Sequence, residues 1–353
     1  AVSEASFSDD PARLLRAVRL AAELNFTIEA KTRGLISVQS QLIVGVAGER
    51  VHEELCRLMA AHGTAGSLRN SRDPGIHHGE VPELNQARGV EQPVEHFWDV
   101  FDHSIETVAA VERLLELGES SYHKDDVLNL VPWSPQLTLY FDREVASGVS
   151  RWTLLKVAAL LHDVAKPRTK STGENGRTHF LGHCKEGAAM AGDILERLRF
   201  SNREIDVVKG IVRYHLRPTQ VGNGGLPSGR AIYRYFRDVG DVAIDTLFFS
   251  LADHLASRGP RLDPAQWRQH TQIVEYVLSE HFMEESTSTP QKLIDGHDVM
   301  DIFGLSPGPR IGELLEAVRE AQAEGEVRSR EEALSLIGRL LSSDLRCSGA
   351  SKK

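Results

Sequence analysis

The chain has 353 residues, 41% hydrophobic and 26% charged, so it is long enough for two or three domains and is not a disordered chain. A formal net charge of −9 excludes a uniformly basic surface for binding nucleic acid, so any RNA-binding face must be local. Three distant cysteines, Cys56, Cys184 and Cys347, exclude a disulfide framework and a cysteine zinc knuckle. Because no apolar run approaches the roughly 18 residues of a bilayer span and no signal peptide is evident, we expect a cytoplasmic protein without a membrane partner.

The first 62 residues are predicted to form a compact helical module. Apolar residues recur at helical spacing from residue 10 to residue 24. Arg13, Arg16 and Arg19 lie three apart on a neighbouring face and form a local positive patch. Two further helices are predicted over about 30–38 and 47–61. The polar stretch GTAGSLRNSRDPGIHHGE then reads as a loop in a linker over 63–95.

The rest of the chain also has helical periodicity, and strand-like alternation is almost absent. A loop-like insert near SYHKDD and VPWSP interrupts the pattern once. Helices are predicted over 98–117, 152–164, 183–198, 202–214, 228–236, 242–257, 264–280, 311–323 and 329–342. We therefore predict an all-α protein with a helical bundle over 96–282 and a small helical C-terminal segment over 283–353, without an internal repeat.

Six histidine and aspartate residues are candidate metal ligands. In chain order they are His103, His162, Asp163, His183, His215 and Asp253. Imidazole and carboxylate groups bind one or two divalent ions, with Mn, Mg, Ni, Co and Fe as candidates. The adjacent pair in LLHDVAKP ends an apolar helix, which is where a buried helix presents ligands to a cleft. A lone histidine on an amphipathic helix is more often packed or solvated, but the combination is more specific than its members.

Asp163 and Lys166 of this segment are predicted to be catalytic. Consecutive helical residues point about 100° apart, so His162 can bind one ion while Asp163 bridges two. Lys166, just past the helix end, is placed to meet a phosphate, as is Arg168.

Three other histidines are close enough to the site to contact it or its substrate: His96, His179 and His254. Seven are assigned to surfaces or loops: His52, His62, His77, His78, His123, His281 and His297.

With these motifs the sequence resembles the HD superfamily of metal-dependent phosphohydrolases and, more closely, the bacterial tRNA nucleotidyltransferase/poly(A) polymerase family. FSDDPARLLRAVRLAAELNFTIEAKTRGLI is similar to that family's stretch from the nucleotide-base-reading motif into the neck helices. VEHFWDVFDHSIETV, LLHDVAKP and LADHLASRGP resemble its HD domain. LIDGHDVMDIFGLSPGPRIGELL and AQAEGEVRSREEALSLI resemble its C-terminal helices, so the resemblance covers nearly the whole chain.

The resemblance implies a nucleotide-binding role for Asp10 and Arg13. In the family, the matching pair hydrogen-bonds the Watson–Crick edge of incoming CTP or ATP. A carboxylate accepts from an exocyclic amine and a guanidinium donates to a ring nitrogen or carbonyl, so the chemistry is suitable. Asp9 stands where the family more often has Glu. The alternative interpretation is that Asp10 caps a helix and Arg13 belongs to a solvated face.

The sequence departs from the family in its polymerase head. The family's Gly-Gly turn, its Arg-Asp element and its Mg²⁺-binding DxD pair are not found, and GNGGLPSGR at 222–230 has no carboxylate pair after it. We therefore expect no nucleotide transfer by this chain alone. It is either the tail of a longer enzyme, which we favour, or a headless descendant.

Two functions remain open. One is an HD phosphohydrolase acting on a phosphate ester, of a nucleotide or an RNA end. The other is a non-catalytic RNA-binding body of a tRNA nucleotidyltransferase, with tRNA as the favoured partner and the HD residues kept for structure. Metal content separates the two. The segment RAIYRYFR at 230–237 is either a positive face with aromatic side chains for stacking on bases or an amphipathic helix with its aromatic side chains in the core.

Overall fold

The protein is described by a computed structural model that covers residues 5–70, 81–119, 126–173, 176–222, 225–286 and 292–349. These residues confirm the all-α prediction. Among them, strands occur only in two short antiparallel hairpins. β1 (Glu144–Ala146) pairs with β2 (Val149–Ser150), and β3 (Ser171–Thr172) pairs with β4 (Thr178–His179). No helix in the described part of the chain is long and apolar enough to cross a membrane.

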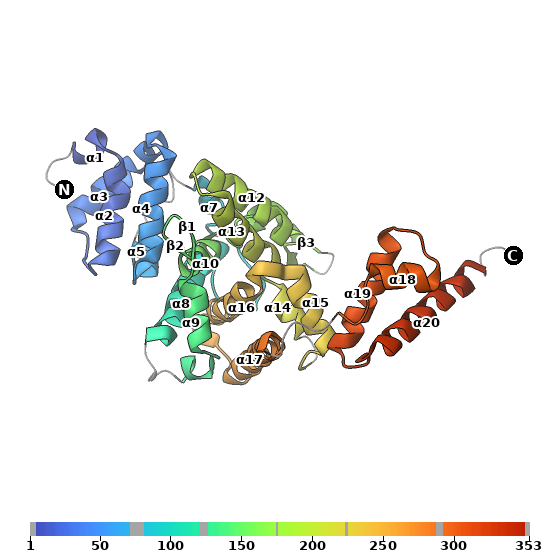
Figure 1. Cartoon of the computed structure of the whole chain (residues 1–353). Helices are drawn as coiled ribbons and strands as arrows, with labels where there is room; N and C mark the ends of the chain where they lie inside the picture. The colour runs from blue at the N-terminus through green and yellow to red at the C-terminus, as the bar shows by residue number, and fades with distance from the viewer. Residues whose placement is uncertain are drawn as a thin grey trace. The chain divides into compact units, whose positions relative to one another are not determined.

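The chain forms two compact units, and each is made of two segments (Figure 1). The first unit contains residues 1–219 and 241–274, and the second contains residues 220–240 and 275–353. The ranges 1–62, 63–95, 96–282 and 283–353 stay predictions, since they describe a division by sequence motifs rather than by compactness.

The N-terminal helices of the first unit pack through α2 and α4. They are α1 (Ser6–Asp9), α2 (Ala12–Glu23), α3 (Ala30–Gln39), η1 (Ser40–Gly45), α4 (Gly48–Ala60), α5 (Thr64–Asn70) and α7 (Pro82–Asn85). The prediction of a loop for the polar stretch GTAGSLRNSRDPGIHHGE is in part wrong, because helix α5 lies in its first half. The predicted positive patch is also wrong: Arg19 is buried, its Nε lies 2.6 Å from Glu54 Oε2, and Arg16 Nε lies 2.8 Å from Glu54 Oε1.

The centre of the first unit is α10, in which every residue from Arg151 to Leu161 is buried. Ser150 begins this helix by accepting a hydrogen bond from the Thr153 backbone. The helix packs against α4, α8, α13 and α16. Its C-terminal end therefore delivers the two residues that follow it into the interior of the unit.

Besides α10 and α15 (Gly229–Val239), the helices between residues 100 and 286 are α8 (Val100–Glu119), η2 (Leu128–Leu130), α9 (Pro135–Asp142), α11 (Lys166–Thr169), α12 (His183–Arg197), α13 (Asn202–Tyr214), α14 (Arg217–Val221), η3 (Gly240–Val242), α16 (Ala243–Arg258), η4 (Gly259–Arg261) and α17 (Pro264–Ser286). The boundaries between the two units fall within α14, η3 and α17. The insert predicted to be loop-like contains α9, whose Phe141 stacks on Trp152 with ring centroids 4.2 Å apart. Ser201 and Glu204 form a capping box that begins α13.

The second unit has its own apolar core. It includes α15 (Gly229–Val239), α18 (Gly296–Phe303), α19 (Pro309–Ala323) and α20 (Arg330–Gly349). Val299, Leu314 and Ile337 are among its fully buried residues. A Cβ on Gly229 would lie 2.2 Å from the Ala323 carbonyl oxygen, so only glycine permits this approach of α15 to α19.

Segment RAIYRYFR forms most of α15 and supports the amphipathic interpretation. Tyr235 is buried, with 1% of its surface exposed. The arginines face acidic side chains of the same unit: Arg234 Nε lies 2.7 Å from Glu320 Oε1, and Arg237 Nη1 lies 2.6 Å from Glu316 Oε1. These arginines are therefore already paired, and they do not form a free positive face.

Candidate metal centre

All six predicted metal ligands come together inside the first unit. His103 lies in the first turns of α8, and Asp253 lies in α16. His162 and Asp163 directly follow α10, His215 directly follows α13, and His183 is the first residue of α12. Four of these side chains are at most 2% exposed, namely His103, His162, Asp163 and His215.

One set of ligand atoms surrounds His103. Its Nε2 lies 2.9 Å from Asp253 Oδ1, 3.2 Å from His162 Nε2 and 3.7 Å from Asp163 Oδ2. His162 Nε2 in turn lies 3.0 Å from Asp163 Oδ2. Ligands of one ion with bonds of about 2.0 to 2.2 Å are separated by similar distances.

A second set lies on the other side of the Asp163 carboxylate. His183 Nε2 lies 3.6 Å from Asp163 Oδ1 and 3.4 Å from His215 Nε2. One oxygen of Asp163 therefore faces His162 and the other faces His183. A carboxylate in this position is suited to bridging two cations, as the sequence predicted for Asp163.

The backbone determines which ring nitrogen is available for a ligand. The Nδ1 atoms of His162, His183 and His215 lie 2.9, 2.7 and 2.8 Å from the carbonyl oxygens of Ala159, Phe180 and Val212. A carbonyl only accepts, so each Nδ1–H donates, and in the neutral ring each Nε2 carries a lone pair. The Nε2 lone pairs of His183 and His215 then face each other without a proton between them, an arrangement that a cation stabilises.

The electrostatics of the centre also favour a cation. Burial alone would raise the pKa of Asp163, but His162 and Lys166 outweigh it and hold that pKa well below the usual range. Burial lowers the pKa of His183, and it lowers the pKa of His215 to about 4. The pKa of His162 rises because the attraction of Asp163 outweighs burial. The pKa of Asp253 is also lowered, because its hydrogen bond with His103 outweighs burial, so two ionised carboxylates face one lysine, Lys166.

One buried polar atom that faces this centre, Asp163 Oδ1, has no hydrogen-bond partner. Buried polar atoms in this condition call for an explanation such as an ion. The donors are imidazole and carboxylate groups, which are ligands of first-row divalent ions. The residues present therefore fit one or two divalent cations.

Lys166, predicted to be catalytic, lies beside the ligands. Its Nζ is 2.6 Å from Asp163 Oδ2 and 2.6 Å from Gln92 Oε1, and the residue is only 6% exposed. Gln92 holds the ammonium in place and was not found in the sequence, because a single glutamine far from the motif gives no pattern. Arg168, the other predicted phosphate contact, is exposed.

The remaining histidines have varied surroundings. His96 lies next to the centre, with its ring 5.3 Å from the His103 ring, while His254 stacks on His270, which the sequence did not single out. His179 is exposed on β4. Of the seven histidines assigned to surfaces or loops, His62 is exposed in a turn and His297 is 87% exposed. His52 and His281 are half-buried on helices, where His52 contacts Phe200 and His281 stacks on Phe236 at 3.9 Å. His77, His78 and His123 lie outside the described residues.

The predicted nucleotide-binding pair lies apart from this centre in the sequence, at the start of the chain. Asp10 follows α1, and its Oδ1 lies 3.0 Å from Arg50 Nη2. Arg13 Nε lies 3.7 Å from Asp10 Oδ2, and Arg13 Nη1 donates to the Ser6 carbonyl at 3.2 Å. The hydrogen bond from Arg50 lowers the pKa of Asp10. The base-reading role of Asp10 and Arg13 stays a prediction.

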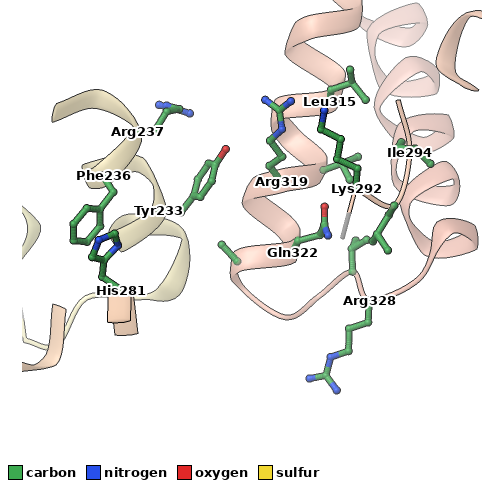
Figure 2. A pocket seen from close by; sticks show the side chains of 14 residues that line it. Tyr233, Phe236, Arg237, His281, Lys292, Ile294, Leu315, Arg319, Gln322 and Arg328 are labelled. Carbon is green, nitrogen blue, oxygen red and sulfur yellow. The ribbon is translucent and has the colours of Figure 1, made fainter. Parts of the chain in front are cut away.

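The second unit contains a cavity of about 730 Å³ (Figure 2). Its walls combine aromatic rings, cationic groups, an amide and aliphatic side chains. The polar and aromatic residues among them are Tyr233, Phe236, Arg237, His281, Lys292, Arg319, Gln322 and Arg328. Lys292 and Arg328 form no ion pair with a described residue, so their positive charges remain available to a ligand.

Comparison with known families identifies three regions. The HD domain family matches residues 100–258. The family described as putative tRNA nucleotidyltransferase domain 2 matches residues 262–337, and the family described as the probable RNA and SrmB-binding site of polymerase A matches residues 25–88. These matches agree with the sequence motifs of the neck, of the HD region and of the C-terminal helices.

Known proteins resemble the chain over almost its whole length. It is 31% identical to the A-adding tRNA nucleotidyltransferase of Deinococcus radiodurans, over 96% of this chain and 70% of that protein. It is 33% identical to the CC-adding tRNA nucleotidyltransferase of Thermus thermophilus, over 95% of this chain and 68% of that protein. An apo CCA-adding enzyme has the same fold, with a TM-score of 0.52 and 16% identity over 95% of this chain and 60% of that one. The sequence relatives establish that the chain belongs to the tRNA nucleotidyltransferase family.

Proposed function

We propose that this chain is the tRNA-holding part of a tRNA nucleotidyltransferase and that its HD region is a metal-dependent phosphohydrolase. The observation that supports the hydrolase most directly is the buried cluster of six ligands around Asp163. The tRNA-holding role is supported by the relatives of the chain, which are named A-adding and CC-adding tRNA nucleotidyltransferases. A Thermotoga maritima CCA-adding enzyme with a TM-score of 0.50 was solved with tRNA.

The proposed hydrolysis uses the residues as follows. A bound divalent ion would polarise the phosphoryl group and lower the pKa of an attacking water. Asp163, Asp253 and the four histidines would hold the cation in a buried site, where electrostatic interactions are stronger than in water. Lys166 has three N–H donors, and Asp163 and Gln92 face two of them. The remaining donor is available to a phosphate oxygen and would stabilise its charge.

The RNA-holding role is supported by local positive charge in an acidic chain. The cavity of the second unit presents Lys292 and Arg328 together with the ring of Tyr233 and the amide of Gln322 (Figure 2). Cationic groups bind phosphates and aromatic rings stack on bases, so this surface suits an RNA strand. We include nucleotide-base reading by Asp10 and Arg13 in the proposal only for an enzyme in which a polymerase domain supplies the Mg²⁺-binding carboxylates.

A metal and activity assay tests the hydrolase. The full chain, purified without chelator, should contain or bind at least one equivalent of Mn²⁺, Co²⁺ or Ni²⁺ and hydrolyse a 2′,3′-cyclic nucleotide or a generic phosphodiester. Asp163→Asn should abolish hydrolysis and weaken metal binding with unchanged helix content. His297→Ala, at a residue whose side chain is 87% exposed, is the matched control and should behave like the parent.

The outcome also separates the two functions weighed from the sequence. A parent chain that binds no metal, or that binds metal without hydrolysing any phosphate ester, would leave a non-catalytic RNA-binding body with a vestigial HD site. Loss of tRNA binding in Lys292→Ala without loss of hydrolysis would separate the two proposed roles within one chain.

A further inference from the structure

A cysteine lies at the second set of ligand atoms. Cys184 is the second residue of α12, and its Sγ lies 3.5 Å from His183 Nε2. The ligand atoms of His183, Cys184 and His215 all lie within 4.8 Å of one another. The motif of His and Asp residues does not include this cysteine.

Two of the printed separations match edges of a tetrahedral site. With Zn–N bonds of about 2.05 Å and a Zn–S bond of about 2.3 Å, tetrahedral angles place two nitrogens about 3.3 Å apart and a nitrogen and a sulfur about 3.6 Å apart. The corresponding separations here are 3.4 Å between the Nε2 atoms of His183 and His215 and 3.5 Å between Cys184 Sγ and His183 Nε2.

A fourth donor faces the same space independently of the cysteine. Asp163 is 1% exposed, its Oδ1 has no hydrogen-bond partner, and this oxygen lies 3.6 Å from His183 Nε2. The backbone carbonyls of Phe180 and Val212 direct the two imidazole lone pairs toward this space, as described above. His183 Nε2 therefore has three potential ligand atoms within 3.6 Å: the Nε2 of His215, the Sγ of Cys184 and the Oδ1 of Asp163.

We propose that Cys184 is a metal ligand and that it makes this half of the centre selective for Zn²⁺. The inference rests on the proposed metal centre and adds that its two halves differ in chemistry. The set around His103 offers only nitrogen and oxygen, which suit harder ions such as Mn²⁺. A thiolate favours softer ions, and Zn²⁺ is the common ion that accepts sulfur, nitrogen and oxygen in a tetrahedron. On binding, the thiol proton is released to solvent and the sulfur–zinc bond forms.

Cobalt spectroscopy on the full chain tests this assignment without reference to catalysis. After bound metal is removed with a chelator, Co²⁺ is titrated into the parent, Cys184→Ser and Cys56→Ser. Cys56 is a buried cysteine of the same unit and serves as the matched control. We expect a near-ultraviolet sulfur-to-cobalt charge-transfer band in the parent and in Cys56→Ser, and its loss in Cys184→Ser.

Zinc competition supplies a second measurement. With a chromophoric chelator as competitor, Cys184→Ser should weaken one Zn²⁺ site by about tenfold or more, the scale on which loss of supporting groups acts at such sites, while Mn²⁺ affinity changes little. A parent that binds Co²⁺ without the band, or a band that persists in Cys184→Ser, would overturn the role of Cys184 and leave the hydrolase proposal standing. A parent that binds no divalent ion would overturn both. If Cys184→Ser does not fold, the band in the parent and in Cys56→Ser decides.

Discussion

Glu112→Gln is expected to destabilise the first unit strongly, because Glu112 is the counter-ion of a buried lysine. Lys156 on α10 is 2% exposed, and its Nζ lies 3.2 Å from Glu112 Oε1 and 2.8 Å from the Ala61 carbonyl oxygen. The Glu112 carboxylate also accepts from the backbone N–H groups of Thr64 and Ala65 at 2.7 and 3.1 Å. One ion pair therefore joins the start of α5 to α8 and α10.

The expected magnitude follows from these contacts. Removal of one partner of a buried ion pair costs about 3–5 kcal/mol, because the other charge stays buried without compensation. The Glu112 side chain is 15% exposed, and glutamine keeps an oxygen for the Thr64 N–H, so we expect the lower end, about 3 kcal/mol. For a unit of this size, this corresponds to a fall in Tm of about 6–12 °C.

Tryptophan fluorescence during urea unfolding measures the effect in the right unit. All four tryptophans, Trp98, Trp133, Trp152 and Trp267, belong to the first unit, so the signal reports this unit alone. A double-mutant cycle with Lys156→Met should show that the two costs are less than additive by at least about 1 kcal/mol, because the double variant buries neither charge. A cost for Glu112→Gln below 1 kcal/mol, or additive costs, would refute the reasoning.

Three further predictions concern other parts of the chain. The pKa of Glu54 is lowered because Arg19 and Arg16 outweigh burial. The ionised carboxylate therefore stabilises the fold above its ordinary pKa of 4.5, and this stability is lost as the pH falls through the lower pKa of the folded state. Glu54→Gln should reduce the loss of stability at acidic pH, measured by urea unfolding with tryptophan fluorescence. Gly229→Ala should destabilise the second unit in circular-dichroism melts, whereas Gly312→Ala, where a Cβ would meet nothing within 4 Å, should be neutral or stabilising by up to about 1 kcal/mol. Lys292→Ala should weaken tRNA binding and reduce its salt dependence in filter-binding titrations, and an unchanged salt slope would contradict a phosphate contact.

Periodicity and motif spacing predicted most helices and the six converging ligands. His162, Asp163, His183 and His215 were predictable because they lie at helix ends, which follow from local sequence, and His103 and Asp253 were predictable from the motifs around them. Cys184, by contrast, is a single residue with no recurring pattern, and its meaning depends on the imidazoles that the fold places beside it. Gln92 is similar, since it contacts Lys166 from 74 residues away.

Charge patterns were the least reliable guide. Arg16 and Arg19 have the spacing of a solvated positive face, but the fold places Glu54 against both, 38 and 35 residues away. The arginines of α15 are paired in the same way with Glu316 and Glu320. A helix face can be located from sequence, but its partner is chosen by tertiary packing, which a single sequence does not reveal.

The division of the first unit into two segments constrains the order in which the metal centre can assemble. Five of the six ligands precede residue 220, but Asp253 belongs to the segment 241–274, which follows residues of the second unit. During synthesis from the N-terminus, His103 lacks its closest carboxylate until α16 has been made and has packed against α8. A nascent chain that ends before this helix has an incomplete set of the proposed ligands, so under the proposed function tight metal binding would be a late event that reports completion of the bundle.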